Sequence, residues 1–397
     1  MAVKRKRITR RKFISGVGAS LVLPVVGSCL GCNSDSNSDS SDSSYRTRLV
    51  ILGSSGGVSW WQSSNRASTS TALVVEDTIY LIDIGQGTAD RLARAFNHDA
   101  ANPDGSYGGN GSSTFLKDLK VLFFTHLHQD HTADYPSLLL IGPGAGLNSD
   151  RPLQVYGPCN RGQLDINKSK YTGNIIENCD CDSGLTTTTP GIKLMTKTIW
   201  QAYAQTINNM TLDAGYPDFT QVVKINELGT PLAYKDSPTC PAMSPFKVYE
   251  DDLVRVSATL VDHHQVYPAF AFRFDTDDGS VVISGDTGKN TNGNLQLLAE
   301  GVDFLVHEVI DREWVDIRFG YPDPIKNPTT YALKRHMLEA HTAIDDVGAV
   351  AESCWAKNLV LNHIVPGDAP LDHLQKAANN FSGELIISED LMEIGIG

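Results

Sequence analysis

The chain has 397 residues, of which 41% are hydrophobic, and this is enough for one large domain or two small ones. Its formal net charge is −13, although a basic cluster stands at the N-terminus, so the remainder is more acidic still. An acidic field repels phosphates, and the composition therefore argues against a nucleic-acid partner.

Residues 1–28 have the composition of an export signal. Seven basic and no acidic residues stand there, and the apolar stretch at 13–26 is short and glycine-rich for a membrane span. The sequence around Arg10 and Arg11 resembles a twin-arginine signal, and an ordinary secretion signal is the alternative. Removing this segment leaves 26 basic against 46 acidic residues, a net charge of −20.

A lipid-attachment site and a tether follow the signal. Residues 26–29 resemble a bacterial lipobox in which Cys29 becomes the lipidated residue, with Cys32 as the weaker candidate. Residues 29–44 are mostly Ser, Asp and Asn, cannot bury apolar surface and are expected to be a disordered tether. We therefore predict an exported protein of the periplasm or cell envelope, held at the membrane by a lipid anchor. A plain secreted protein is the alternative.

The folded domain is predicted to span residues 45–397 and to begin with strands. Residues 48–52 form the first expected strand, and the glycine-rich loop at 53–57 lacks the Lys-Ser/Thr of a P-loop. Residues 71–75 and 78–84 predict a hairpin, which ends in a turn containing Asp83. A helix is expected over 88–97.

The central feature is the motif His-x-His-x-Asp-His at 126–131, directly after the apolar run 121–124, which has the character of a buried strand. Four metal-ligating side chains in six residues predict a metal-binding loop, since imidazole and carboxylate suit zinc and similar ions. His126 and His128 can face one ion, and Asp130 and His131 a second. A helix at 135–141 and a strand at 153–158 are expected next.

Residues 159–245 are predicted to be an insertion with its own character. Four of the seven cysteines lie here: Cys159, Cys179, Cys181 and Cys240. Disulfides are the default expectation in an exported protein, with three pairings open, and a separate cysteine zinc site is less favoured. Helical spacing runs over 192–212.

The second half repeats the strand pattern. Strands are expected at 253–261, 269–274, 280–284, 303–306 and 359–363, and helices at 329–338 and 343–353. Polar residues of ligand type follow these strands, namely His263, Asp286, Glu308 and His363. Two strand-rich halves with helices outside imply an αβ/βα sandwich whose ligands converge from strand ends at one edge.

From residue 48 to the C-terminus, these motifs resemble the metallo-β-lactamase fold superfamily. The resemblance implies an α+β, four-layer αβ/βα sandwich that holds two Zn²⁺ ions, with Mn²⁺ or Fe as alternatives. The first ion would be held by His126, His128 and His263, the second by Asp130, His131 and His363, and Asp286 would bridge them. His264 remains the alternative to His263.

Two adjacent ions lower the pKa of a shared water, so that hydroxide can attack a phosphorus, sulfur or carbonyl centre. Glu308 and His341 resemble the Glu/His pair of the ribonuclease Z and arylsulfatase branches, which supports protonation of the leaving group. Asp130 could also serve as acid or base. His98, His307, His336 and His373 are interpreted as structural or surface residues.

The order of the motifs fits the ribonuclease Z-like group, and residues 202–204, 213–217 and 227–228 resemble its arylsulfatase-like branch. The main interpretation is therefore an exported dinuclear-zinc hydrolase of a small-molecule ester, with a homodimer as one option. A phosphodiesterase or lactonase is the alternative enzyme, whereas the acidic charge disfavours tRNA processing. A surface binding lipoprotein with a structural metal site is the alternative of another class.

Overall fold

The computed structural model describes residues 45–57, 59–96, 114–161, 176–180, 185–229, 239–289 and 292–397. Residues Ser44–Gly397 form one compact unit. The predicted export signal, Cys29, the tether, His98 and Cys181 lie outside the described residues. In the part of the chain that is described, no helix is long and apolar enough to cross a membrane.

Two seven-stranded sheets form the centre of the molecule. The first contains, in spatial order, β16 (Glu393–Ile396), β1 (Thr47–Gly53), β2 (Ser70–Val75), β3 (Thr78–Ile82), β4 (Leu119–Phe123), β5 (Leu153–Pro158) and β8 (Val223–Leu228). The second contains β15 (Glu384–Ile387), β14 (Asn358–Val365), β13 (Phe304–Ile310), β12 (Ser280–Ile283), β11 (Phe270–Asp275), β10 (Arg255–Leu260) and β9 (Phe246–Glu250). Each sheet is antiparallel on one side and parallel on the other.

An aromatic core lies between the sheets. The ring of Phe123 on β4 lies 5.5 Å from Tyr156 in its own sheet, and 5.3 and 5.4 Å from Phe272 and Phe274 on β11 of the opposite sheet. Alternate residues of the central strands face this core, and the other set faces helices. The central strands are therefore buried on both faces, which explains their nearly continuous apolar runs, whereas β8, β9, β15 and β16 are partly exposed.

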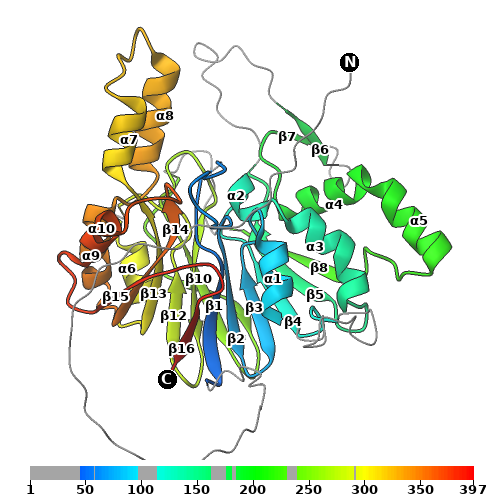
Figure 1. Ribbon diagram of the computed structural model, residues 1–397. Helices are drawn as coiled ribbons and strands as arrows, with labels where there is room; N and C mark the ends of the chain where they lie inside the picture. Colours follow the sequence, from blue (N-terminus) through cyan, green and yellow to red (C-terminus); the bar gives the residue numbers. More distant parts are fainter. Residues whose placement is uncertain are drawn as a thin grey trace, which may run out of the picture. The chain divides into compact units, whose positions relative to one another are not determined.

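Helices cover the two outer faces (Figure 1). The first sheet packs against α1 (Thr88–Phe96), α3 (Tyr135–Ile141) and α4 (Ile192–Ala202). The second packs against α6 (Asn294–Ala299), α9 (Ile344–Ser353) and α10 (Leu371–Leu374). The remaining short elements are α2 (Gln129–Thr132), the 3₁₀ turns Gly142–Ala145 and Gln375–Ala378, and the hairpin β6 (Asn178–Asp180) and β7 (Leu185–Thr187). The predicted four-layer αβ/βα sandwich is confirmed.

Among the longer helices, two features differ from the prediction. Residues 192–212 form two helices, α4 and α5 (Ala204–Ala214), because the chain leaves helical geometry at Tyr203. The helix α7 (Arg312–Phe319) was not predicted; Asp311 caps it by accepting hydrogen bonds from the amides of Glu313 and Trp314. Together with α8 (Pro328–Glu339), α7 forms a hairpin that stands out from the sandwich (Figure 1).

The segment 159–245 is only partly an insertion. Its strand β8 pairs with β5 as the edge of the first sheet, so this part belongs to the sandwich. Cys240 is buried as a free thiol, and its sulfur accepts a hydrogen bond from Asn292 Nδ2 at 2.9 Å. Two disulfides among the four cysteines would need Cys240, so none of the three open pairings forms in full, whereas a single disulfide among the other three stays a prediction.

Candidate metal centre

The loop at residues 125–131, the metal loop, leaves the end of β4 and enters α2. Asp83 holds this loop: its Oδ1 accepts a hydrogen bond from the Thr125 amide at 2.9 Å, and its Oδ2 lies 2.8 Å from His131 Nδ1. A carboxylate on Nδ1 fixes the ring so that Nε2 is the free nitrogen. Gly85 permits the metal loop to approach closely, since a Cβ at this position would lie 2.0 Å from the Asp130 carbonyl oxygen.

The predicted ligands come together in two groups that share one residue. Potential ligand atoms of His126, His128, His263 and Asp286 lie within 4.8 Å of one another, as do those of Asp130, His131, Asp286 and His363. Oδ2 of Asp286 lies 3.8 Å from Nε2 of both His126 and His263. Its Oδ1 lies 3.2 Å from Nε2 of both His131 and His363. The two carboxylate oxygens thus face different groups, which is the arrangement of a bridging ligand.

His263, and not His264, enters the first group. His263 is fully buried, and its Nδ1 lies 2.9 Å from the Ala340 carbonyl oxygen, which leaves Nε2 for the cluster. His264 is partly exposed and lies 3.6 Å from a carboxylate oxygen of Glu339. The ambiguity between these two neighbours is resolved by side-chain direction.

A β-bulge aims His363 at the second group. Glu308 on β13 pairs with Asn362, and Val309 pairs with Ile364, so His363 is the extra residue. Its φ of 44° lies in the left-handed region, which residues other than glycine rarely adopt. The imidazole packs on Gly56, where a Cβ would lie 2.1 Å from His363 Cε1. Contrary to the prediction, His363 and Glu308 lie within strands and not at their ends.

The donor set fits a divalent cation. Four buried atoms of the cluster residues, namely His126 Nε2, His131 Nε2, Asp286 Oδ1 and His363 Nδ1, lack a hydrogen-bond partner within the described ranges. Buried polar atoms without partners are rare, and bound metal would satisfy the first three, which face the two ligand groups. Burial disfavours the charge of Asp286, but the imidazoles of His363 and His131 hold its pKa well below the usual range. The site is a divalent metal site; two ions and zinc remain predictions.

Glu308 and His341 form the predicted pair, which lies beside His363 of the second group, while His341 also lies beside His263 of the first. Oε1 of Glu308 accepts a hydrogen bond from the Thr342 amide at 2.7 Å, and Oε2 lies 3.3 Å from His341 Nδ1. The same nitrogen lies 3.9 Å from Asp286 Oδ2. Burial disfavours a charged His341, but Glu308, followed by Asp286, raises its pKa to about 9.

His336 also reaches the centre, although the sequence did not assign it there. It lies near the end of α8, and its potential ligand atom is within 4.8 Å of those of His263 and His341. Burial lowers the pKa of His336 to about 4. His336 lies inside a helix, whereas the predicted ligands lie at or after strand ends, so the sequence pattern does not indicate this residue.

Comparisons with known proteins bear on the fold and on the class of activity. No family model matches the chain. A ribonuclease Z of Mycobacterium sp. (strain KMS) is 25% identical over 338 residues, which cover 84% of this chain and 91% of the relative. A ribonuclease Z of Mycobacterium bovis (strain BCG / Pasteur 1173P2) is 24% identical and covers 84% of this chain and 93% of its own length.

Solved structures share the fold. The short form of human tRNase Z covers 88% of this chain and 99% of its own, with a TM-score of 0.52 and 19% identity. The long form of RNase Z from yeast covers 91% of this chain and 43% of its own, with a TM-score of 0.51 and 16% identity. The predicted metallo-β-lactamase fold, similarity to the ribonuclease Z-like group and metal-dependent hydrolase class are confirmed, while the arylsulfatase-like branch stays a prediction.

The prediction of no nucleic-acid partner is wrong, because the curated relatives that match most of the chain are ribonucleases. The net charge of the chain does not exclude a nucleic-acid partner, because it does not show how the charges are distributed around the site. Among the described residues, those that line the cavity next to His128 include Arg161 and no carboxylate. A small-molecule ester and a lipid anchor find no support, and the homodimer stays a prediction.

Proposed function

We propose that this chain, which has the metallo-β-lactamase fold and is similar to ribonuclease Z, is a metal-dependent phosphodiesterase that cleaves RNA. One observation carries the proposal: Asp286 divides its two oxygens between two imidazole groups, directly beside the Glu308–His341 pair. The name of the relatives supports RNA as the substrate class.

The residues of the cluster would hold the metal and orient the phosphate. Five imidazoles and two carboxylates converge, with His131 oriented by Asp83 and His263 by the Ala340 carbonyl. A bound divalent ion would supply Lewis-acid polarisation of the phosphoryl oxygen and a water of lowered pKa. Because the loop and strands fix these side chains before substrate binds, little reorganisation is needed during the reaction.

The Glu308–His341 pair would serve the leaving group. Hydrolysis forms one bond from a water oxygen to phosphorus and breaks the bond to the leaving oxygen, which then takes a proton. Glu308 lies against Nδ1 of His341, so Nε2 is the nitrogen from which His341 can deliver that proton.

Sulfate-ester hydrolysis of the arylsulfatase type is the second candidate. The resemblance at residues 202–204 lies at the end of α4, and α4 lines the cavity beside the metal centre. A sulfate monoester carries a similar oxyanion, so the same residues could act on either centre.

A substrate panel separates the two functions. Zinc-loaded protein is offered bis(p-nitrophenyl) phosphate, a single-stranded RNA and p-nitrophenyl sulfate, with Asp286→Ala as the matched inactive control. We expect turnover of the phosphodiester and the RNA, absent in the variant. Hydrolysis of the sulfate without any phosphodiester cleavage would overturn the proposal in favour of the second candidate.

A further inference from the structure

A cavity of about 520 Å³ adjoins the metal centre. The metal loop contributes Leu127 and His128, α4 contributes Thr198 and Ile199, and the segment after β10 contributes Tyr267. His128 belongs both to this lining and to the first ligand group. Binding pockets for small organic groups span roughly 300–1,000 Å³, so the cavity can hold a group attached to the scissile ester.

The cavity lining differs from the acidic composition of the chain as a whole. Most of its side chains are apolar, and none of the described residues that form it is acidic, although the chain has a net charge of −13. Arg161 places a guanidinium there: its Nη1 donates to the Gln265 carbonyl at 2.8 Å, and its Cζ lies 5.5 Å from the centre of the Tyr267 ring. An anionic substrate with an apolar, uncharged appendage matches this lining.

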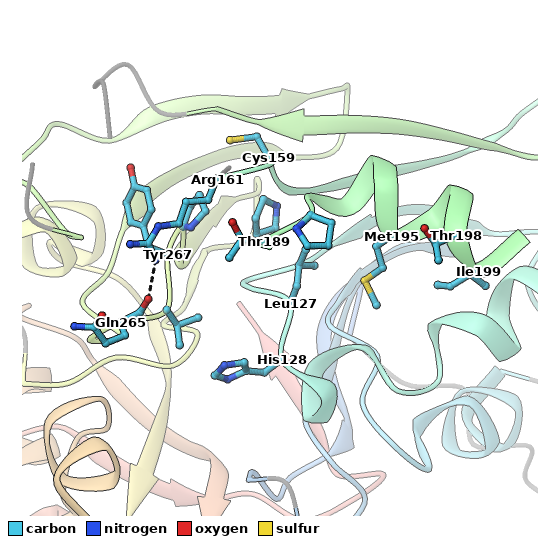
Figure 2. A pocket seen from close by; sticks show the side chains of 14 residues that line it. Leu127, His128, Cys159, Arg161, Thr189, Met195, Thr198, Ile199, Gln265 and Tyr267 are labelled. Carbon is cyan, nitrogen blue, oxygen red and sulfur yellow. Dashed lines mark hydrogen bonds between the residues drawn. The ribbon is translucent and has the colours of Figure 1, made fainter. Parts of the chain in front are cut away.

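The cavity has two facing walls. Figure 2 shows Tyr267 and Arg161 on one side, and Met195, Thr198 and Ile199 of α4 on the other, with His128 at the metal end. A flat ring held between these walls would contact an aromatic and guanidinium face on one side and aliphatic side chains on the other. Such stacking is tolerant of the base, because every nucleobase has a π-face.

We propose that this cavity binds one unstacked nucleobase of the nucleotide whose phosphate is cleaved. The proposal rests on the phosphodiesterase function proposed above. The base enters between Tyr267 and α4, while its phosphate reaches the metal centre past His128. The insertion that supplies α4 is then the segment that selects the substrate.

Two chromogenic esters with the same leaving group test the subsite. The p-nitrophenyl ester of thymidine 5′-monophosphate carries a base, whereas methyl p-nitrophenyl phosphate does not. Thr198→Trp narrows the cavity. Gln201→Trp introduces the same side chain at an exposed residue of α4 that does not line the cavity. Metal content and circular dichroism establish that both variants are folded and loaded.

The wild type is expected to favour the nucleotide ester in kcat/KM by on the order of 10-fold, the usual scale of one stacked base. Thr198→Trp should remove this preference by raising KM for the nucleotide ester alone, and Gln201→Trp should keep it. Tyr267→Leu, which removes the ring without filling the cavity, should lower the preference several-fold. Calorimetry with thymidine 5′-monophosphate should show similar affinities for the wild type and Gln201→Trp, and weaker binding by Tyr267→Leu and Thr198→Trp.

The outcomes separate the subsite from the activity. If neither ester is hydrolysed, the proposed phosphodiesterase function fails together with the subsite. If both esters are hydrolysed equally well, or Thr198→Trp slows both alike, only the subsite is wrong. A wild-type preference for bis(p-nitrophenyl) phosphate over the nucleotide ester overturns the assignment to a nucleobase and assigns the cavity to any aryl group.

Discussion

Asp286 is the residue on which the two halves of the metal centre depend. Its oxygens lie 3.2 Å from His131 and His363 on one side and 3.8 Å from His126 and His263 on the other. A neutral imidazole would offer one donor nitrogen to a metal ion, whereas the carboxylate of Asp286 would offer an oxygen to each ligand group. We therefore expect the loss of a terminal ligand to be tolerated better than the loss of Asp286.

Purified protein should contain close to two divalent ions per chain, and Asp286→Ala should lose at least one of them together with activity. The reason is that both ligand groups lose a donor at once. Elemental analysis of the two proteins measures this directly. Asp277→Ala, at a side chain that is 85% exposed, is the control and should keep the full metal content. One ion or none in fully active wild type would rule out the dinuclear site.

His341→Ala should slow turnover while leaving the metal content unchanged. General acid catalysis contributes on the order of 10²–10⁴-fold, so the loss should fall in that range for a phosphodiester with a poor leaving group. It should be small for a nitrophenyl ester, whose phenolate departs without a proton. Kinetics on both substrates, with metal analysis, provide the test. Loss of zinc, or equal slowing of both substrates, would exclude the role of proton donor.

At the scale of elements, β14 and the loop after β1 position His363 jointly. The bulge turns the residue toward Asp286, and Gly56 leaves the space that the imidazole occupies. Gly56→Ala should therefore displace His363 and weaken metal binding in the second group, measurable by titration with a chelator. Gly229→Ala, at a position where no atom of the described residues lies within 4 Å of the added Cβ, is the matched control and should bind metal as the wild type does.

Asp251 links the two sheets through polar contacts. Its Oδ2 accepts hydrogen bonds from Tyr80 on β3 at 2.7 Å, from Lys120 on β4 at 2.6 Å and from Tyr249 on β9 at 2.7 Å. Burial disfavours its charge, but the hydrogen bonds from Lys120, Tyr249 and Tyr80 hold the pKa of Asp251 well below its ordinary value. The contact is therefore made by the ionised carboxylate at neutral pH.

Asp251→Ala should lower the free energy of unfolding by about 1–3 kcal/mol at pH 7, because hydroxyl and ammonium donors lose their acceptor. The folded pKa is depressed, so the stabilisation is complete above the unfolded pKa of roughly 3.9 and is lost as pH falls through the folded pKa. Urea denaturation of both proteins at neutral and acidic pH should show the difference shrinking. Asp252→Ala, at the exposed neighbour, should be nearly neutral at both.

At the scale of the whole molecule, export is proposed from residues 1–28, which lie outside the described part of the chain. Replacing Arg10 and Arg11 by Lys keeps the charge but removes the twin-arginine pair. The double variant should accumulate inside the cell, as measured by fractionation and immunoblotting of the full chain. Unchanged export would leave the ordinary secretion signal as the route.

The sequence alone determined most of the sandwich and indicated most of the candidate ligands. Apolar runs of strand length predicted the core strands, since each is buried on both faces, and β5 and α3 begin and end as predicted. His126, His128, Asp130 and His131 were found because they are close in the chain, so one local motif contains them. Short elements such as α6 and α7 carried too little periodicity to be predicted.

Only the tertiary structure decided what depends on distant segments. His336 joins the centre because α8 packs near the strand ends, and no spacing in the sequence encodes that approach. The choice between His263 and His264 depended on the Ala340 carbonyl, which lies 77 residues further along the chain. Likewise, a net charge is a sum over the sequence, whereas the cavity beside Arg161, whose described lining residues include no acid, exists only once the loop after β5, α4 and the segment after β10 have come together. Folding brings these segments together because their apolar faces pack against one another. The local sequence of one segment therefore does not indicate which polar groups of another segment become its neighbours.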